Sequence, residues 1–593
     1  TDLEFAASSS VNVSSTGTGN IDLDGLGALT LNLITAPQNF TVNSAGAITN
    51  SGSLAITGDA TFDNSGGTDD AITLNNTSNA FNGTVTFNTD SGSAVTIVDT
   101  TALDLVALTA GSLSVTAGGA VTDSGTLAIT GATTISASGQ DITLDEAAST
   151  FGTLSLTGAN VAVTDAGATD LGASTVSGTL DITSSGAVTD SGTLAITGAT
   201  TISASGQDIT LDEAASSFGT LSLTGANVAV TDAGATDLGA STVSGTLDII
   251  SAGDVTDSGV LDVVGDLVIT TTADNGSVSL NQASDIDGAL SVTTDGTGTT
   301  SVANLTGSID LGTITTSSLT IDARGITQSG VSTVSGASSF SSGANEIVLN
   351  QANDFTGAVS LSNIGTNAVT IDDANDLVLG TVSIVAGDLN IDNAGTITQS
   401  GLISVGGNTV LDNSDADNAD ITLANANNVF TGTVTFITDT GSDISIADTT
   451  VFDLGALAVN SLIVSAGGDI SDSGVLDIAT TASFTTTAAN GNVVLSQASD
   501  IDGALSIATH GTGTSSVTNL TDAIDLGTVS SAALTIEADG AITQSGAATI
   551  SGDSSFINTD GDNAAISLNN ASNSFGGSIS LATDSGSAVT LTD

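Results

Sequence analysis

Several residue types are missing from this sequence, and each absence narrows what the protein can be. Its 593 residues include no cysteine, methionine, tryptophan, tyrosine or lysine, and only one proline. Without cysteine, no disulfide framework holds the fold and no thiol is available for chemistry. Arg324 and His510 are the only basic side chains against 64 Asp and Glu residues, so the formal net charge is −63. Such a surface repels nucleic acid and anionic membranes, and we expect neither as a partner.

Long hydrophobic runs are also missing. No apolar stretch approaches the roughly 18 residues that a membrane-spanning helix needs, so we expect no membrane insertion. No signal peptide is visible, because the sequence pattern is already under way at Thr1 and still running near Asp593. Turns that would cap a stacked-repeat protein are not recognisable. We therefore expect this chain to be a fragment of a longer one.

Despite its acidity, the chain has the pattern of a folded β protein. Hydrophobic residues make up 39% of it, and Val, Ile, Leu and Thr alternate with small polar residues, which acidic disordered chains do not show. This alternation predicts short strands separated by turns of Gly, Asn, Asp and Ser. In one representative stretch we expect strands at 127–129, 134–136, 142–144, 154–156, 161–163, 174–176 and 180–182.

An internal repeat organises the whole chain. The 64 residues from Gly119 to Ile182 return as Gly186 to Ile249 with one difference, Thr150 becoming Ser217. Weaker copies fill the rest of the chain at intervals of 67 to 74 residues. Each copy has a hydrophobic-Thr/Ser-Asp/Asn/Gln-Ser-Gly segment, here called the Ser-Gly turn, then an apolar-x-Leu strand, then a large apolar residue shortly before a glycine. The turns begin at Ile48, Val121, Val188, Val255, Ile326, Ile397, Ile470 and Ile542; the strands begin at Ile72, Ile142, Ile209, Val278, Ile347, Ile421, Val493 and Ile566; the large residues are Phe81, Phe151, Phe218, Ile286, Phe355, Phe430, Ile501 and Phe575.

A fixed period of this length is typical of stacked repeats. We expect an all-β fold, a parallel β-helix (β-solenoid) in which eight repeats of about 70 residues form a single continuous solenoid over residues 1–593. If each repeat makes about three turns of roughly 22 to 24 residues, the chain forms about 25 coils. Each coil would pair its strands with those of the coil below at about 4.8 Å, with apolar side chains inside.

The recurring segments LAITG, DITL and LSLTGANVAVTDA, together with the Ser-Gly turns, resemble the repetitive shafts of large bacterial exoproteins of the filamentous haemagglutinin type. The resemblance covers essentially the whole chain. It implies a right-handed parallel β-helix, secretion to the bacterial cell surface or beyond, and an adhesive or scaffolding role.

Acidic clusters just before three of the strands are the candidate metal sites. Oxygen-rich corners of this kind suit calcium, but their spacing matches neither the EF-hand loop nor the calcium-binding nonapeptide of other β-rolls. The spacing favours solvated acidic corners that divalent cations screen diffusely, with specific calcium as the alternative; no cofactor is required by either interpretation. The clusters are Asp63, Asp69 and Asp70; Asp412, Asp415, Asp417 and Asp420; and Asp560 and Asp562.

The sequence has little material for catalysis, and we expect no enzyme. Arg324 stands where sister repeats carry Ala394 or Asp539, and His510 stands where an earlier repeat carries Asp295, so both are interpreted as surface substitutions. Asp145 and Glu146 are a carboxylate pair of the type that glycosidases use. Because adjacent strand residues face opposite sides, a solvated turn is the better interpretation of this pair.

The sequence therefore predicts a structural extracellular protein, the shaft of a surface fibre, an adhesin or a matrix filament. Self-association, head-to-tail or by divalent-cation bundling, is its expected partnership. The alternative is an adhesin module that binds a glycan or a host protein. A polysaccharide-active β-helix enzyme is a third hypothesis, and it would need a cleft with converging acids.

Overall fold

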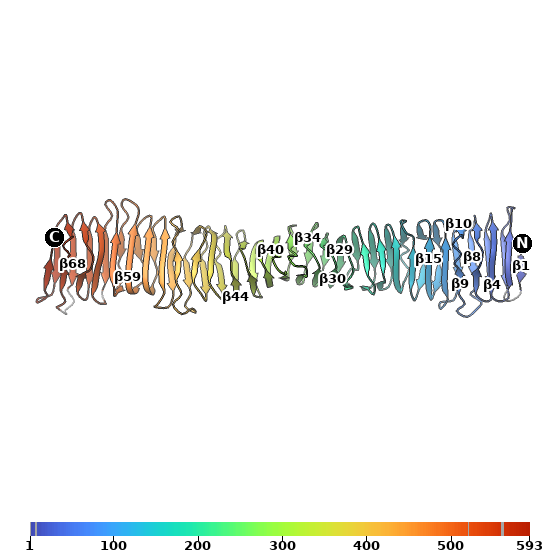
Figure 1. Cartoon of the computed structure of the whole chain (residues 1–593), viewed down its shortest axis with the longest axis horizontal. Coiled ribbons are helices and arrows are strands. Elements are labelled where there is room, and N and C mark those ends of the chain that lie inside the picture. Colours follow the sequence, from blue (N-terminus) through green and yellow to red (C-terminus); the bar gives the residue numbers. More distant parts are fainter. Residues whose placement is uncertain (1, 6–8, 520, 559–562) are drawn as a thin grey trace. The chain divides into compact units, whose positions relative to one another are not determined.

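The computed structural model describes residues 2–5, 9–519, 521–558 and 563–593. These residues form strands and turns, from β1 (Asp2–Phe5) to β72 (Val589–Leu591), with no helix in the described ranges. Their contacts define two compact units, unit 1 (Thr1–Gly288 and Thr294–Gly296) and unit 2 (Ala289–Thr293 and Thr297–Asp593). In each unit the strands of successive turns lie side by side in parallel (Figure 1). The predicted all-β solenoid is confirmed; continuity of the two units as one solenoid stays a prediction.

The second repeat shows how the sequence pattern becomes strands. All seven strands expected there are present, and the structure adds β16 (Val121–Asp123) and β22 (Thr169–Leu171). The first three residues of this Ser-Gly turn are therefore a strand, and the chain bends at Ser124 and Gly125. The seven expected strands are β17 (Leu127–Ile129), β18 (Thr133–Ser136), β19 (Ile142–Leu144), β20 (Thr153–Gly158), β21 (Val161–Asp165), β23 (Ser174–Val176) and β24 (Leu180–Ser184).

The register of the strands gives the length of a turn. In unit 1, a ladder of paired residues that starts in the second Ser-Gly turn climbs seven steps, of 17 to 21 residues each, and ends in the fourth Ser-Gly turn. Seven turns for two repeats is three and a half turns for each repeat. The ladder is Val121, Ile142, Val161, Leu180, Thr200, Leu221, Leu238 and Asp257.

Unit 2 has the same half-turn offset. A ladder from the fifth Ser-Gly turn, at Ile326, also reaches the seventh, at Asp472, after seven steps. Equivalent residues of consecutive repeats in one unit therefore lie on opposite sides of the solenoid. The chain makes about 29 turns, so the expected 25 coils were too few. That estimate assumed a whole number of turns in each repeat, whereas short strands and tight corners close a turn in about 20 residues.

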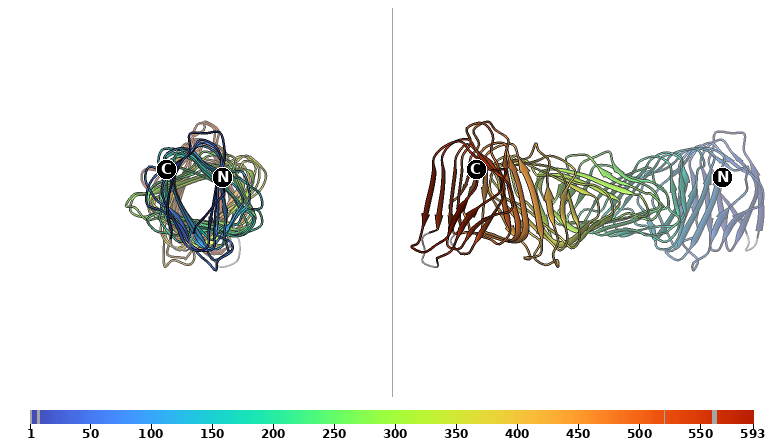
Figure 2. Two further views of the ribbon diagram at one scale, coloured as in Figure 1. Left: turned by 90° about the vertical axis from the view of Figure 1, so that its right-hand side faces the viewer. Right: turned by 60° about the vertical axis from the view of Figure 1, so that its left-hand side comes forward.

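The core lies inside the turns, where every second strand residue points. Along β20, Leu154 and Leu156 are buried, and Ser155 between them faces outward. The end-on view in Figure 2 shows the chain winding round this central region, which the inward side chains fill. Phenylalanines occupy its wider places in local pairs, such as Phe340 with Phe355 at 5.8 Å between ring centroids. Such burial on every turn is the main source of stability.

The glycine of the Ser-Gly turn is needed because the backbone of the turn below runs directly beneath it. A Cβ atom at Gly192 would lie 2.3 Å from the backbone nitrogen of Ala173. At Gly474 the same atom would lie 2.1 Å from the backbone nitrogen of Ala456. All eight turn glycines meet backbone atoms at less than 3.0 Å: Gly52, Gly125, Gly192, Gly259, Gly330, Gly401, Gly474 and Gly546. Close stacking of turns thus explains why this glycine recurs.

Candidate functional site

Two of the predicted acidic corners have the same local structure. One connects β8 (Ala60–Asp63) to β9 (Ile72–Leu74), and the other connects β51 (Thr409–Asp412) to β52 (Ile421–Leu423). In both, the Oδ1 atom of the first aspartate accepts the backbone N–H of the serine two residues on at 3.0 Å and its hydroxyl at 2.7 Å. Asp63 and Asp412 are therefore used to fold their corners.

The other aspartates of these corners point to different places. The Asp69 side chain is exposed, and the backbone carbonyl of Asp70 accepts a hydrogen bond from Asn64 Nδ2 at 2.6 Å. Asp420 Oδ1 accepts the backbone N–H of Asp443 at 3.0 Å. Within the described ranges, no three acidic or histidine side chains converge so that they could hold a metal ion. Calcium at these corners stays a prediction; Asp415 and Asp417 are exposed, and Asp560 and Asp562 lie outside the described residues.

The structure joins Asp412 to two aspartates that the sequence had not singled out. Asp372 on β46 (Val369–Asp373), Asp392 on β48 (Leu389–Asn393) and Asp412 are registered partners on three successive turns. Burial, and then the charges of Asp392 and Asp415, raise the pKa of Asp372. Burial, and then the charges of Asp412 and Asp415, raise the pKa of Asp392. The only sequence signal was an aspartate recurring every 20 residues.

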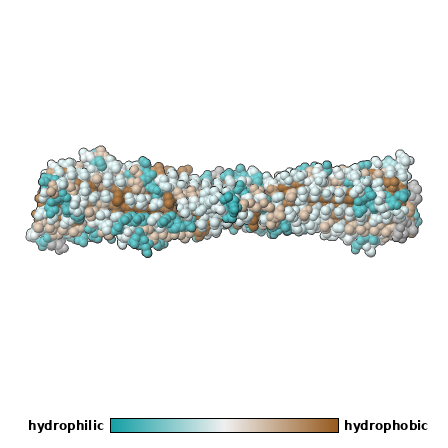
Figure 3. Space-filling view, in the orientation of Figure 1, coloured by the Kyte–Doolittle hydropathy of each residue, from teal (hydrophilic) through white to brown (hydrophobic). Residues whose placement is uncertain are grey.

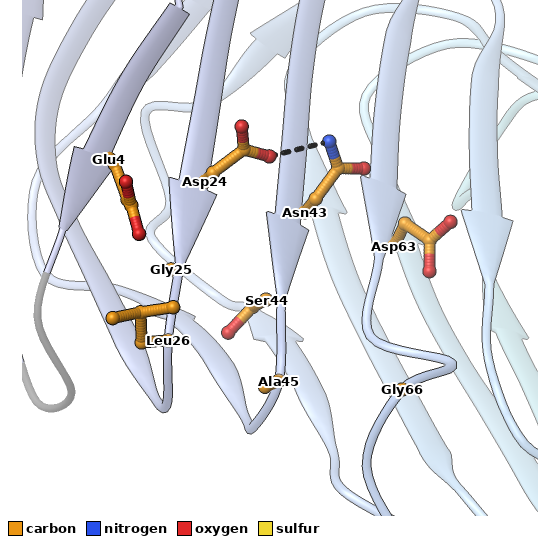
Figure 4. Close-up of a pocket in the computed structure, with 9 residues that line it drawn as sticks. All are labelled: Glu4, Asp24, Gly25, Leu26, Asn43, Ser44, Ala45, Asp63 and Gly66. Carbon is orange, nitrogen blue, oxygen red and sulfur yellow. Dashed lines mark hydrogen bonds between the residues drawn. The ribbon is translucent and has the colours of Figure 1, made fainter.

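A second ladder separates its charges with amides. Asp24 on β3 (Ile21–Gly25), Asn43 on β5 (Phe40–Ser44), Asp63 and Asn88 on β11 (Val85–Asn88) are registered in that order. Asn43 Nδ2 donates to Asp24 Oδ1 at 2.9 Å (Figure 4), and Asn88 Nδ2 donates to Asp63 Oδ2 at 3.1 Å. With Glu4 beside Asp24, these side chains line a hollow of about 550 Å³ on unit 1. Its lining is acidic and polar, with Leu26 as the exposed apolar member.

The two basic residues lie apart from these ladders. His510 is exposed in a turn, and its Nδ1 donates to the backbone carbonyl of Thr486 at 2.7 Å. Gly511 after it and Gly296 in the earlier repeat have left-handed φ values of 65° and 60°. The expected surface turn is therefore present. Arg324 is exposed on β41 (Ser318–Gln328).

The carboxylate pair Asp145 and Glu146 lies in the corner after β19, which confirms a turn there. The backbone N–H of Asp145 donates to Asp123 Oδ1 at 2.9 Å, across one turn of the solenoid. Asp123 is the third residue of its Ser-Gly turn. It belongs to a device that the sequence had not revealed.

This device, here called the turn clasp, joins the third residue of each Ser-Gly turn to a buried residue one turn later. The buried residue accepts the backbone N–H of the residue that opens the strand after the Ser-Gly turn. For example, Ser149 Oγ accepts the N–H of Leu127 at 3.0 Å, and Asn428 Oδ1 accepts the N–H of Ile403 at 3.1 Å. The eight clasps are Asn50–Asn79, Asp123–Ser149, Asp190–Ser216, Asp257–Ser284, Gln328–Asn353, Gln399–Asn428, Asp472–Ser499 and Gln544–Asn573.

The third turn residue closes the clasp from the other side. In every repeat its side-chain oxygen accepts a backbone N–H from the corner above, as Gln399 Oε1 accepts that of Asn425 at 3.1 Å. An amide at this position is always paired with Asn, and Asp is always paired with Ser. Gln399 and Asn428 exchange two amide hydrogen bonds of 2.9 Å. A carboxylate has no hydrogen to exchange, so its partner carries a hydroxyl instead.

A second set of buried aspartates holds the large apolar residues in place. The Oδ1 atoms of Asp99, Asp373 and Asp448 accept the backbone N–H groups of Phe81, Phe355 and Phe430. Burial raises the pKa of all three carboxyls, and it raises that of Asp373 to about 7 despite the Phe355 hydrogen bond, helped by the charge of Asp354. In the clasps, burial together with the charges of Asp145 and Glu146 raises the pKa of Asp123 to about 6.

The repeats that carry these devices match a known family described as repeats of unknown function (DUF5649). Eight segments match: 18–88, 92–157, 158–224, 225–293, 297–362, 366–437, 441–508 and 512–582.

The chain belongs to this family.

The eight DUF5649 repeats agree with the eight units expected from the sequence and with the β-solenoid of the structure. The filamentous haemagglutinin identity itself is not among the matches. No curated protein and no solved structure matches the chain. In the part of the chain that the structure describes, no helix is long and apolar enough to cross a membrane.

Proposed function

We propose that these DUF5649 repeats form part of the shaft of an extracellular fibre, adhesin or matrix filament, as in filamentous haemagglutinin-type exoproteins. The observation that carries this proposal is the turn clasp, which ties one turn to the next in all eight repeats. A force along such a stack is shared by equal contacts, with no weak repeat among them. Uniform reinforcement of this kind suits a load-bearing element.

The surface chemistry supports the same role. With no lysine and one arginine, Arg324, the chain offers trypsin-like proteases almost nothing to cleave. The charge of −63 keeps neighbouring shafts apart, and divalent cations that screen it would bring them together. On the face drawn in Figure 3, hydrophobic residues form small separate patches. Head-to-tail association through strand edges would lengthen a fibre built from such shafts.

Immunolabelling of the organism that makes the chain tests this proposal. Antibodies raised against the purified repeats should label intact cells, and electron microscopy should place the label along surface fibres or matrix. Antibodies against a cytoplasmic protein serve as the control for leaky cells. Labelling seen only after permeabilisation would rule out the extracellular shaft.

A groove on unit 2 favours glycan binding as a second candidate function. It has a volume of about 240 Å³ and is lined by hydroxyls of β43 (Ser338–Ser341), β45 (Ala358–Asn363) and β47 (Leu377–Ile384). No charged side chain lines it. Ile364 and Val385, which follow β45 and β47, are 68% and 60% exposed. Hydroxyls beside exposed aliphatic groups match the polar edges and apolar faces of a neutral sugar.

A glycan array with the purified chain tests this second function, with Ser360→Asp as the variant and Ser222→Asp as its control on unit 1. Ser360 lines the groove, and Ser222 faces outward on a strand of unit 1. Neutral glycans should bind the chain and its control variant, and the added charge in the groove should abolish binding. Equal binding by all three proteins would place any glycan site elsewhere.

A further inference from the structure

Three buried oxygen atoms without hydrogen-bond donors lie on successive turns of unit 2. Asp373 ends β46 and is fully buried, and its registered partner Asn393, which ends β48, is 1% exposed. Asn413, on the turn above, is also fully buried. The atoms without a partner are Oδ2 of Asp373, Oδ1 of Asn393 and Oδ1 of Asn413. All three are acceptors, and leaving a buried acceptor unpaired costs about 1–3 kcal/mol.

The rest of each side chain is already engaged. Asp373 Oδ1 accepts the backbone N–H of Phe355 at 3.0 Å. Asn393 Nδ2 donates to the carbonyl of Gly395 at 2.6 Å, and Asn413 Nδ2 donates to the carbonyl of Ala419 at 2.9 Å. Turning either amide over would give up these bonds. An ionised carboxylate has no hydrogen to offer, so the missing donor has to be supplied by protonation of Asp373.

We propose that Asp373 is held as a neutral carboxylic acid whose Oδ2–H donates to Oδ1 of Asn393, which makes this pair of turns a proton-dependent lock. Registered residues of a parallel ladder are about 4.8 Å apart and project in the same direction, which places the two oxygens side by side. One added proton satisfies both orphaned acceptors. The lock is independent of where the chain is located or what it binds.

The charges around Asp373 all favour its neutral form. Asp354 lies on β44 (Ile347–Phe355) on the turn below, Asp372 on the same strand, Asp376 in the corner that follows and Asp392 on the strand above. All are carboxylates, so each disfavours a second negative charge among them. Burial, with the charge of Asp354, raises the pKa of Asp373 to about 7. Loss of the proton above that pH would leave a buried charge between two turns.

The sister repeat provides a natural comparison. Asp448 holds Phe430 as Asp373 holds Phe355. However, Asp448 Oδ2 accepts the hydroxyl of Thr450 at 3.1 Å, and its registered partner is Ala466, which has no side-chain acceptor. Asp448 therefore needs no proton to be satisfied. The lock belongs to the fifth repeat and not to the position as such.

Hydrogen exchange of the full chain at pH 6 and pH 8, followed by mass spectrometry and corrected for intrinsic rates, tests the lock. In the native chain, peptides covering 350–375 should lose protection at pH 8. In Asp373→Asn, the new amide nitrogen replaces the O–H donor, so protection should persist at both pH values. Asp448→Asn, the matched control, should keep the native pH dependence of 350–375. Equal loss of protection at pH 8 in Asp373→Asn would overturn the proposal.

Infrared spectroscopy of the native chain gives a second, independent answer that does not depend on how the variants fold. A protonated carboxyl in an apolar site should show a carbonyl stretch at pH 6 that disappears at pH 8. Absence of that band at pH 6 would mean that Asp373 is ionised and that a buried water or cation serves these oxygens, and the proton lock would be wrong. An Asp373→Asn variant that folds should lack the band.

Discussion

At the residue scale, single atoms decide whether one turn stacks on the next. The Ser-Gly turn was visible in the sequence as a recurring pattern, but its glycine has a reason that only stacking reveals. A side chain there would meet the backbone of the turn below. Elsewhere, glycines in open corners, such as Gly66, have no atom within 4 Å of the position that a Cβ would take. The two kinds of glycine look alike in the sequence.

This difference predicts opposite outcomes for the same substitution. Gly192→Ala should destabilise the fold by about 1–3 kcal/mol, because the new methyl group overpacks against Ala173. Gly66→Ala should change the free energy of unfolding by less than about 0.5 kcal/mol. Urea denaturation followed by circular dichroism measures both. Similar effects of the two substitutions would show that turn spacing does not require the glycine.

The clasp gives a second prediction at this scale. Asn428→Ser should cost about 1–3 kcal/mol, since Gln399 loses both amide hydrogen bonds and a buried gap remains. Adding Gln399→Asp rebuilds the Asp–Ser clasp of other repeats and should recover part of the loss. Recovery should be greater at pH 5 than at pH 8, because burial raises the pKa of the clasp aspartate Asp123 to about 6.

A double-mutant cycle on the free energies of unfolding checks this coupling. The two substitutions should be non-additive by at least about 0.5 kcal/mol, as expected for residues in contact. Gln328→Asp combined with Asn428→Ser, drawn from different clasps, is the control and should be additive. Additivity in the first pair would mean that the Asn/amide and Ser/Asp pairing is coincidental.

At the scale of the strand and turn, the half-turn offset sets what each face presents. Three and a half turns per repeat place equivalent residues of neighbouring repeats of a unit on opposite sides, so a given face shows the same element only once in two repeats. Registered neighbours on one face are therefore different parts of the repeat. Asp372, Asp392 and Asp412 meet in this way. The sequence pattern could not predict such ladders, because they depend on the exact number of residues in each turn.

At the scale of the whole molecule, buried carboxyls set the pH dependence of stability. A raised pKa means that the folded chain holds protons that the unfolded chain has already released, from about pH 4 up to the folded pKa. Stability therefore rises as pH falls through this window, which for Asp373 and Asp123 runs from about 7 and about 6 down to about 4. Burial raises the pKa values of Asp165, Asp190, Asp232 and Asp472 in the same direction.

We expect the thermal midpoint, followed by circular dichroism at constant ionic strength, to rise steadily from pH 8 to pH 5. This is the opposite of ordinary acid denaturation, in which paired carboxylates lose their partners. Repeating the series in high salt separates the buried groups from screening of the surface charge. A midpoint that falls between pH 7 and pH 5 would contradict the raised pKa values.

Calcium titration is the corresponding test of the outer charge. Solvated corners predict that light scattering climbs with calcium as shafts bundle, while the thermal midpoint hardly moves. Sodium chloride at matched ionic strength is the control, because a divalent cation bridges carboxylates more effectively than a monovalent one. A sharp rise of the midpoint at low calcium, with a discrete stoichiometry, would instead identify specific sites at corners such as that of Asp412.

The sequence by itself determined the class of fold, the eight repeats and the strands, because period-two alternation and turn residues are local signals that survive without knowledge of neighbours. It also located the glycines and the acidic corners. Only the tertiary structure decided how many residues close a turn, and with that which side chains become partners. The clasp pairs and the contact of Asp373 with Asn393 join residues 20 to 29 apart. Such spacings follow from corner geometry, which adds up over a turn and leaves no periodic mark in the chain.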